Sequence, residues 1–171
     1  MQKIAKFYKV DFEQFKKDWT DAFGEVENVH EIYEEIMLPK RATVGSAGYD
    51  FYAPYTFELK SGETVKIPTG IRCKIFSGWV LMCFPRSGMG FKYRMQLDNT
   101  VGIIDADYFE ADNQGHIMIK VTNDSKSNKI LKIEKGKGFS QGIFVPFGIT
   151  EDDEVQEKRT GGFGSTDTKS V

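Results

Sequence analysis

The chain has 171 residues, of which 40% are hydrophobic and 28% charged, and its formal net charge is −2. This is an ordinary globular composition for one domain with a sizeable core, and it excludes a bulk positive field that would attract nucleic acid or an anionic membrane. No apolar run approaches transmembrane length, and residues 1–10 lack the apolar stretch of a signal peptide. We therefore expect a cytoplasmic protein with no nucleic-acid or membrane partner.

Residues 11–36 predict a helical hairpin that ends at Pro39. Hydrophobic side chains recur at helical spacing on one face of each half. They are Phe12, Phe15, Trp19, Ala22 and Phe23 in the first half, and Val26, Val29, Ile32, Tyr33 and Ile36 in the second. We expect most of them to pack on the rest of the domain. The alternative is a patch that stays exposed and binds a protein partner.

From residue 47 onward, short strand-like segments alternate with glycine-containing turns. β-branched and aromatic residues, many in period-2 alternation, predict strands within 51–59, 63–75, 79–85, 100–105, 116–121, 128–133 and 142–147. This pattern favours an all-β sandwich or barrel. We expect residues 1–150 to form one β domain, followed by a charged linker and a mobile end at 151–171.

The two cysteines, Cys73 and Cys83, lie in apolar strand-like runs. This placement is typical of reduced, partly buried thiols. The two histidines, His30 and His116, are too few to form a metal site with them, so we interpret both as structural or surface residues.

The segment PRSGMG at 85–90 offers groups that hold phosphate oxygens. They are the guanidinium of Arg86, the hydroxyl of Ser87 and free backbone N–H groups. A β-turn with a surface arginine is the commoner explanation of such a segment.

The segment NTVGIIDADYFE at 99–110 places an acidic residue after a buried apolar run. Asp105 is a candidate general base if it can reach a water molecule. If the strand continues, Asp105 and Asp107 share one side and Tyr108 points to the other. Taken alone, the segment favours two aspartates that end the strand and face solvent.

The segment RTGGFGST at 159–166 suits a nucleotide, although it lacks the lysine of a P-loop. Its glycines allow the backbone to approach phosphates. Arg159, Ser165 and Thr166 can bind a terminal phosphate, and Phe163 can stack on a base. A disordered tail is the alternative, but it does not explain a single phenylalanine among glycines. Together the three segments predict a site for an anionic ligand with a flat ring.

Five segments in order resemble the five motifs of the homotrimeric dUTPase family, some members of which are encoded by phages. They are AGYD (47–50), PRSGMG (85–90), NTVGIIDADY (99–108), GKGFSQ (136–141) and RTGGFGST (159–166). The flanking pieces LPKRAT (38–43) and GETVKIPTGI (62–71) are similar too. The resemblance covers roughly residues 38–148 and the tail, which is most of the chain.

The resemblance implies a β-barrel or jelly-roll subunit with an inserted helical hairpin, a flexible C-terminal arm, and a homotrimer whose sites are shared between subunits. The reaction would be hydrolysis of dUTP to dUMP and pyrophosphate with Mg²⁺. Asp105 would activate the water that attacks the α-phosphorus, and Gln141 would help to hold that water. Asp50 would lie near Mg²⁺, acting through a bound water, because Mg²⁺ dehydrates reluctantly and is held mainly by phosphates and water.

The substrate contacts that the resemblance implies fall into three groups. Arg86, Ser87 and Gly88 would contact phosphates. Asn99 would read the uracil edge, Ile104 would contact the substrate, and Tyr108 would pack on the deoxyribose and leave no room for a 2′-hydroxyl. The tail would act as a lid from a neighbouring subunit, with the γ-phosphate and uracil contacts coming from Arg159, Gly162, Phe163, Gly164, Ser165 and Thr166.

Two departures from the family pattern stand out. A longer loop, FEADNQG at 109–115, replaces a short glycine turn, and the helical hairpin has no counterpart in the minimal pattern. A dCTP deaminase or a bifunctional deaminase–pyrophosphatase is the nearest rival; Tyr108 and the complete tail argue against it, and Glu110 is the only nearby carboxylate for attack at the base. A binding module on the same fold is the second rival, but this chain retains Asp105, Gln141 and Arg159.

Overall fold

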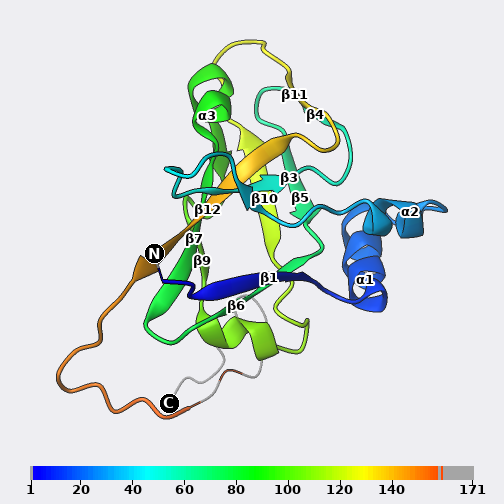
Figure 1. Ribbon diagram of the computed structural model, residues 1–171. Helices are drawn as coiled ribbons and strands as arrows, with labels where there is room; N and C mark the ends of the chain where they lie inside the picture. The colour runs from blue at the N-terminus through cyan, green and yellow to red at the C-terminus, as the bar shows by residue number, and fades with distance from the viewer. Residues whose placement is uncertain (1, 158, 160–171) are drawn as a thin grey trace, which may run out of the picture.

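Strands make up most of the regular structure in the computed structural model, which describes residues 2–157 and Arg159 (Figure 1). The strands are β1 (Ala5–Lys9), β2 (Lys40–Arg41), β3 (Tyr49–Tyr52), β4 (Phe57–Leu59), β5 (Thr64–Pro68), β6 (Ile71–Ile75), β7 (Trp79–Pro85), β8 (Met95–Leu97), β9 (Gly102–Ile104), β10 (Met118–Asn123), β11 (Leu131–Ile133) and β12 (Gly138–Pro146). The helices are α1 (Phe12–Phe23), α2 (Val29–Glu34), α3 (Ser87–Tyr93) and the 3₁₀ helix η1 (Ala106–Glu110). The expected mostly-β architecture is confirmed.

The strands pair antiparallel in separate sheets. The largest has the order β2-β3-β12-β7-β9; the others are β5-β10-β8, β1-β6 and β11-β4. In the part of the chain that is described, these sheets do not join into the closed barrel that the resemblance implied. The ladders stop early because several strands are only three residues long, and the β12–β3 register shifts between Gly138 and Ser140. Side chains, rather than a continuous ladder, therefore join the layers.

The core lies between these sheets. Ile67, Leu81, Val121, Leu131 and Phe139 come from five different strands, and each is 0% exposed. A core assembled from residues so far apart in the chain makes the domain one folding unit, so the arrangement of the strand ends depends on all of its layers.

Helix α1 forms where the sequence predicted a helix and packs as expected on the β domain. The Asp11 side chain accepts a hydrogen bond from the backbone N–H of Gln14 at 2.8 Å, which caps the first turn. Gly24, with φ of 79°, ends the helix, because this left-handed conformation is easy only for glycine. On the inner face Phe15 is 0% and Trp19 is 3% exposed.

Two local expectations were wrong. Helix α2 ends at Glu34, well before Pro39, and only Val29 and Ile32 of it are buried. The segment after Arg86 forms the seven-residue helix α3 instead of a turn. The sequence did not predict this helix because its two glycines have a low helix propensity. Strand β9 ends at Ile104 and η1 follows, so Asp105 and Asp107 come after the end of the strand and are about half-exposed, as the segment taken alone favoured.

Both cysteines are buried and free, as predicted. Burial, with a further contribution from nearby Cys83, raises the pKa of the Cys73 thiol, and burial raises that of Cys83 to about 12. No helix among the described residues is long and apolar enough to cross a membrane.

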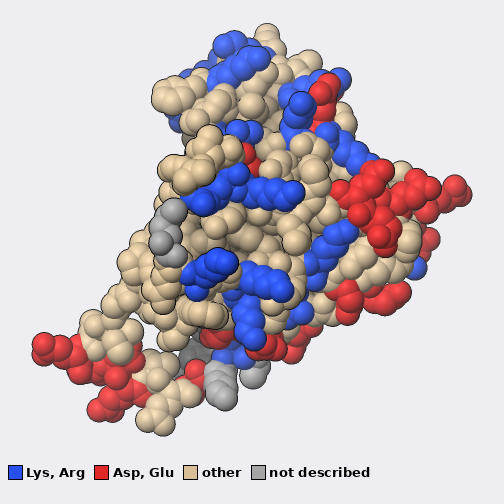
Figure 2. Space-filling view, viewed as in Figure 1, with Lys and Arg blue, Asp and Glu red and all other residues tan. Residues whose placement is uncertain are grey.

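Lysines and arginines gather across the middle of the face in Figure 2, whereas acidic residues cover the side where α1 and α2 lie. A second acidic group follows β12, where Glu151, Asp152, Asp153 and Glu154 are all exposed. The small net charge of −2 thus conceals separate basic and acidic regions.

Candidate functional site

A carboxylate, a guanidinium and an amide meet at one end of the largest sheet. Asp50 lies in β3 directly opposite Gln141 of β12. Arg86, which follows β7, approaches Asp50 with 3.2 Å between Nε and Oδ1. The Gln141 side chain donates to the Pro85 carbonyl at 3.2 Å. The structure therefore brings together three of the predicted site residues from distant parts of the chain, and we call them the phosphate-side group.

Two motif glycines leave the room that this group needs. A Cβ atom on Gly48 would lie 2.6 Å from Oε1 of Gln141, and one on Gly138 would lie 2.8 Å from Nη1 of Arg86. Both distances are shorter than real side-chain contacts, so any larger residue would displace a site side chain. Ser87 beside them is exposed, and a Cβ on Gly88 would meet nothing within 4 Å.

A cavity of about 360 Å³ lies beside β9 and β10. Its lining combines apolar strand residues with a few polar groups, as small-molecule sites commonly do. It includes Asn99, predicted to read the uracil edge, and Ile104, predicted to contact the substrate. The lining residues are Asp18, Lys66, Cys83, Leu97, Asp98, Asn99, Gly102, Ile104, Asn113, Ile117, Met118, Ile119 and Lys120.

Asp105 follows β9 and keeps 49% of its side chain exposed. Arg159, from the end of the same chain, places Nη2 at 3.5 Å from its carboxylate and Nε at 3.9 Å from that of Asp107. The two aspartates thus reach one guanidinium although the strand ends before them. The Arg159 guanidinium also lies over the Tyr108 ring, 5.5 Å from its centroid.

Tyr108 is 1% exposed and is not among the residues that line the cavity. Its hydroxyl donates to the backbone carbonyl of His116 and accepts from Nδ2 of Asn113, both at 2.8 Å. Burial raises its pKa to about 12, although the Asn113 bond opposes the rise. The ring is therefore neutral and held at its polar end by two bonds.

The phosphate-side group and Asp105 lie at different points along β7. Gln141 pairs with Phe84, whereas Ile104 pairs with Leu81. The step of three residues from Phe84 to Leu81 corresponds to about 10 Å along β7. Asp105 comes one residue after Ile104, and so farther still from Gln141. A single chain does not bring Gln141 and Asp105 to one point.

The described residues include no group of three or more His, Cys, Asp or Glu side chains able to hold a metal. Asp50, 16% exposed, offers one carboxylate that it shares with Arg86. One carboxylate suits Mg²⁺, which keeps water and phosphate ligands, better than a metal that needs a full protein cage.

Sequence reasoning missed the polar residues of the cavity that come from outside the motifs. Asp18 lies on α1, and Asn113 lies in the long loop after Tyr108. No local pattern signals that a helix residue faces a cavity between strands. The predicted contacts of Gly162, Phe163, Gly164, Ser165 and Thr166 lie outside the described residues.

Comparisons with known proteins agree on one family. The dUTPase family model matches residues 34–167. The deoxyuridine 5′-triphosphate nucleotidohydrolase of Lactococcus lactis subsp. lactis is 44% identical over 134 residues, covering 77% of this chain and 88% of the relative. That of Haemophilus influenzae is 41% identical over 141 residues, covering 78% and 89%.

Solved structures give the same answer. The dUTPase of Streptococcus mutans superimposes with a TM-score of 0.62 at 32% identity, covering 85% of this chain and 98% of that one. A mutant dUTPase from phage phi11 of S. aureus, described as coordinating a structural Mg(II) ion, gives a TM-score of 0.61 at 20% identity, covering 91% and 98%. The second likeness concerns the fold alone.

Proposed function

Because this chain belongs to the dUTPase family, we propose that it hydrolyses dUTP to dUMP and pyrophosphate. The observation that carries the proposal is family membership together with a cavity lined by Asn99 and Ile104, because Ile104 is followed directly by Asp105, whose carboxylate is half-exposed. A pyrimidine base in this cavity would bring its sugar and α-phosphate toward that carboxylate.

Asp105 is the proposed general base. It takes a proton from water as the water oxygen bonds to the α-phosphorus, and the bond from that phosphorus to the pyrophosphate oxygen breaks. Gln141 helps to hold the water. A carboxylate that is half in solvent can receive a water molecule directly.

We propose that the complete site forms between copies of the chain, in a homotrimer. The support is the spacing along β7. Gln141 pairs with Phe84, whereas Ile104 pairs with Leu81, three residues away, and Asp105 follows Ile104 in the direction that leads away from Phe84. One copy would supply the cavity and Asp105, and another the phosphate-side group.

Mixing two inactive variants tests this arrangement. Asp105→Asn and Gln141→Ala should each lose activity, but unfolding and refolding them together should restore it, because about a quarter of the sites in random mixed trimers then pair an intact Asp105 with an intact Gln141. A mixture as inactive as its components would contradict a shared site.

Arg86, Ser87 and Gly88 are the proposed phosphate contacts. The Arg86 guanidinium is 43% exposed and already neutralises Asp50, so it can turn toward an incoming anion. The open space at Gly88 allows phosphate oxygens to approach the backbone.

Asp50 would hold Mg²⁺ through water. When bound, Mg²⁺ would offset the negative charge of the triphosphate and orient it. To do so, the Asp50 carboxylate would give up its contact with Arg86 and accept hydrogen bonds from the water on Mg²⁺. The Arg86 guanidinium would then be free to turn toward the phosphates.

Asn99 is the proposed reader of the uracil edge, because an amide both donates and accepts. Tyr108 excludes the 2′-hydroxyl, and the tail from Arg159 through Thr166 closes the site and excludes other water. In the single chain Arg159 contacts Asp105, so it must leave that carboxylate to bind a γ-phosphate.

Pyrophosphate release with Mg²⁺ from dUTP, dTTP, dCTP and UTP tests the proposed function. We expect rapid turnover of dUTP alone. Turnover of dCTP with release of ammonia would support a deaminase instead. No turnover of any nucleotide would point to a binding module.

A further inference from the structure

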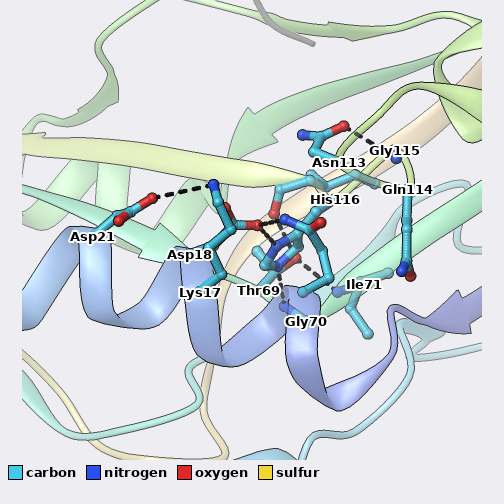
Figure 3. A network of polar contacts seen from close by, with 12 residues as sticks. Lys17, Asp18, Asp21, Thr69, Gly70, Ile71, Asn113, Gln114, Gly115 and His116 are labelled. Carbon is cyan, nitrogen blue, oxygen red and sulfur yellow. Dashed lines mark hydrogen bonds and ion pairs between the residues drawn. The ribbon is translucent and has the colours of Figure 1, made fainter. Parts of the chain in front are cut away.

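A hydrogen-bonded pair connects helix α1 to His116, which lies in the chain between the cavity-lining residues Asn113 and Ile117 (Figure 3). Nδ1 of His116 lies 2.5 Å from Oδ2 of Asp18, and His116 is 0% exposed. On its other side Nε2 of His116 accepts a bond from the backbone N–H of Gly70 at 2.8 Å. Because Nε2 accepts, the proton of the neutral ring sits on Nδ1 and is donated to Asp18.

The electrostatics of Asp18 agree with an ionised acceptor. Burial raises its pKa, but the hydrogen bonds from His116 and Gln14 outweigh burial and hold the pKa below its usual value. Asp18 is therefore a carboxylate at neutral pH, with 14% of its side chain exposed toward the cavity side.

The same histidine holds Tyr108. The His116 carbonyl accepts the bond from the Tyr108 hydroxyl, and Asn113 donates to that hydroxyl from the same loop. The loop also packs directly on the Tyr108 backbone, since a Cβ on Gly115 would lie 2.5 Å from the Tyr108 carbonyl oxygen. A shift of His116 would therefore move Tyr108 with it.

We propose that Asp18 and His116 are positioning residues that fix the Tyr108 ring and so determine discrimination against ribonucleotides. This inference rests on the proposed function, in which that ring excludes the 2′-hydroxyl. A single hydroxyl is a small difference, so the ring must be held within a fraction of an ångström to reject it. Asp18 supplies this constraint from α1, which lies before residue 34, where the match to the family model begins.

The pair also explains what the inserted helix does for the site. Phe15 and Trp19 anchor α1 in the core, and Asp18, between them in sequence, is left facing His116. The helix thus supports the long loop 109–115 from outside, where the minimal family pattern has a short turn. The loop has other long-range contacts, from Asp11 to Gln114 and from Arg72 to the Phe109 carbonyl, but the Asp18–His116 pair acts at the His116 end, where Tyr108 is held.

The test compares kcat/KM for dUTP and for UTP in Asp18→Ala, Asp18→Asn and Asp21→Ala. Asp18→Ala leaves the buried Nδ1–H without a carboxylate, and we expect the dUTP-to-UTP selectivity to fall about tenfold, because displacements of about 1 Å change rates by about 100-fold. Asp18→Asn should retain most of the selectivity, since its amide oxygen still accepts from Nδ1. Asp21, one turn away on α1, is exposed and bonded to Lys17, so Asp21→Ala is the matched control and should change nothing.

A lowered melting temperature with unchanged selectivity in Asp18→Ala would reduce the pair to a structural role and overturn the inference. So would an equal loss in Asp18→Asn, because the charge rather than the hydrogen bond would then act. If Asp18→Ala does not fold, Tyr108→Phe removes only the hydroxyl that His116 holds; its selectivity should also fall, and unchanged selectivity would refute the inference. An inactive wild-type protein would refute the proposed function and this inference together, whereas an active one with unaltered variants refutes the inference alone.

Discussion

Replacing Gly48 by alanine should disable the site without unfolding the protein. The new Cβ atom would lie 2.6 Å from Oε1 of Gln141, and an ordinary contact needs about 3.4 Å. The amide must therefore move by about 0.8 Å. Displacements of about 1 Å in a catalytic group cost about 100-fold in rate, so kcat for dUTP should fall by tens of fold.

The obstacle is the end of a flexible side chain, so the fold can absorb the change. We expect the melting temperature of Gly48→Ala to stay within about 2 °C of the wild type, since displacing the end of one half-buried side chain costs little stability. Gly45→Ala is the matched control, because a Cβ at Gly45 meets nothing within 4 Å. Steady-state kinetics with dUTP and a thermal melt of both variants decide the matter. Full activity in Gly48→Ala would refute the placement of Gln141 in the site.

Three further predictions concern the base, the tail and the core. Asp105→Asn should lower turnover by about 100- to 10 000-fold but leave the Kd of a non-hydrolysable dUTP analogue within a few fold, as calorimetry can measure; near-normal turnover would exclude Asp105 as the base. Deleting residues 159–171 should cut activity severely while light scattering still detects a trimer, and an unaffected rate would remove the tail from the mechanism. Phe15→Ala should lower the free energy of unfolding by about 3–5 kcal/mol in urea, because Phe15 is 0% exposed; a loss below about 1 kcal/mol would mean that α1 does not stabilise the domain.

The motif residues could be found from the sequence because their chemistry is local. Arg86 stands next to a hydroxyl and glycines, and Asp105 follows an apolar strand, so both were candidates for phosphate binding and base catalysis, although each segment alone favoured an ordinary turn or strand end. The order of the five motifs then indicated the family. The helical spacing of Phe15 and Trp19 likewise predicted which side of α1 is buried.

The relative placement of the motifs could not be found in this way. The separation of Gln141 from Asp105 follows from the register of β7 with its two neighbours, which depends on long-range pairing. Helix α3 was missed because two of its seven residues are glycine, and packing overrides that local preference. The Asp18–His116 bond joins residues 98 positions apart, and nothing near either residue indicates it.

The central claim is that water attacks the α-phosphorus of dUTP, and hydrolysis in ¹⁸O-labelled water tests it most directly. The products would be separated before the substrate is exhausted, and their masses would be measured by mass spectrometry. We predict that the label enters dUMP and that pyrophosphate stays unlabelled. Label in pyrophosphate and none in dUMP would mean attack at the β-phosphorus, and that result would contradict the mechanism built on Asp105.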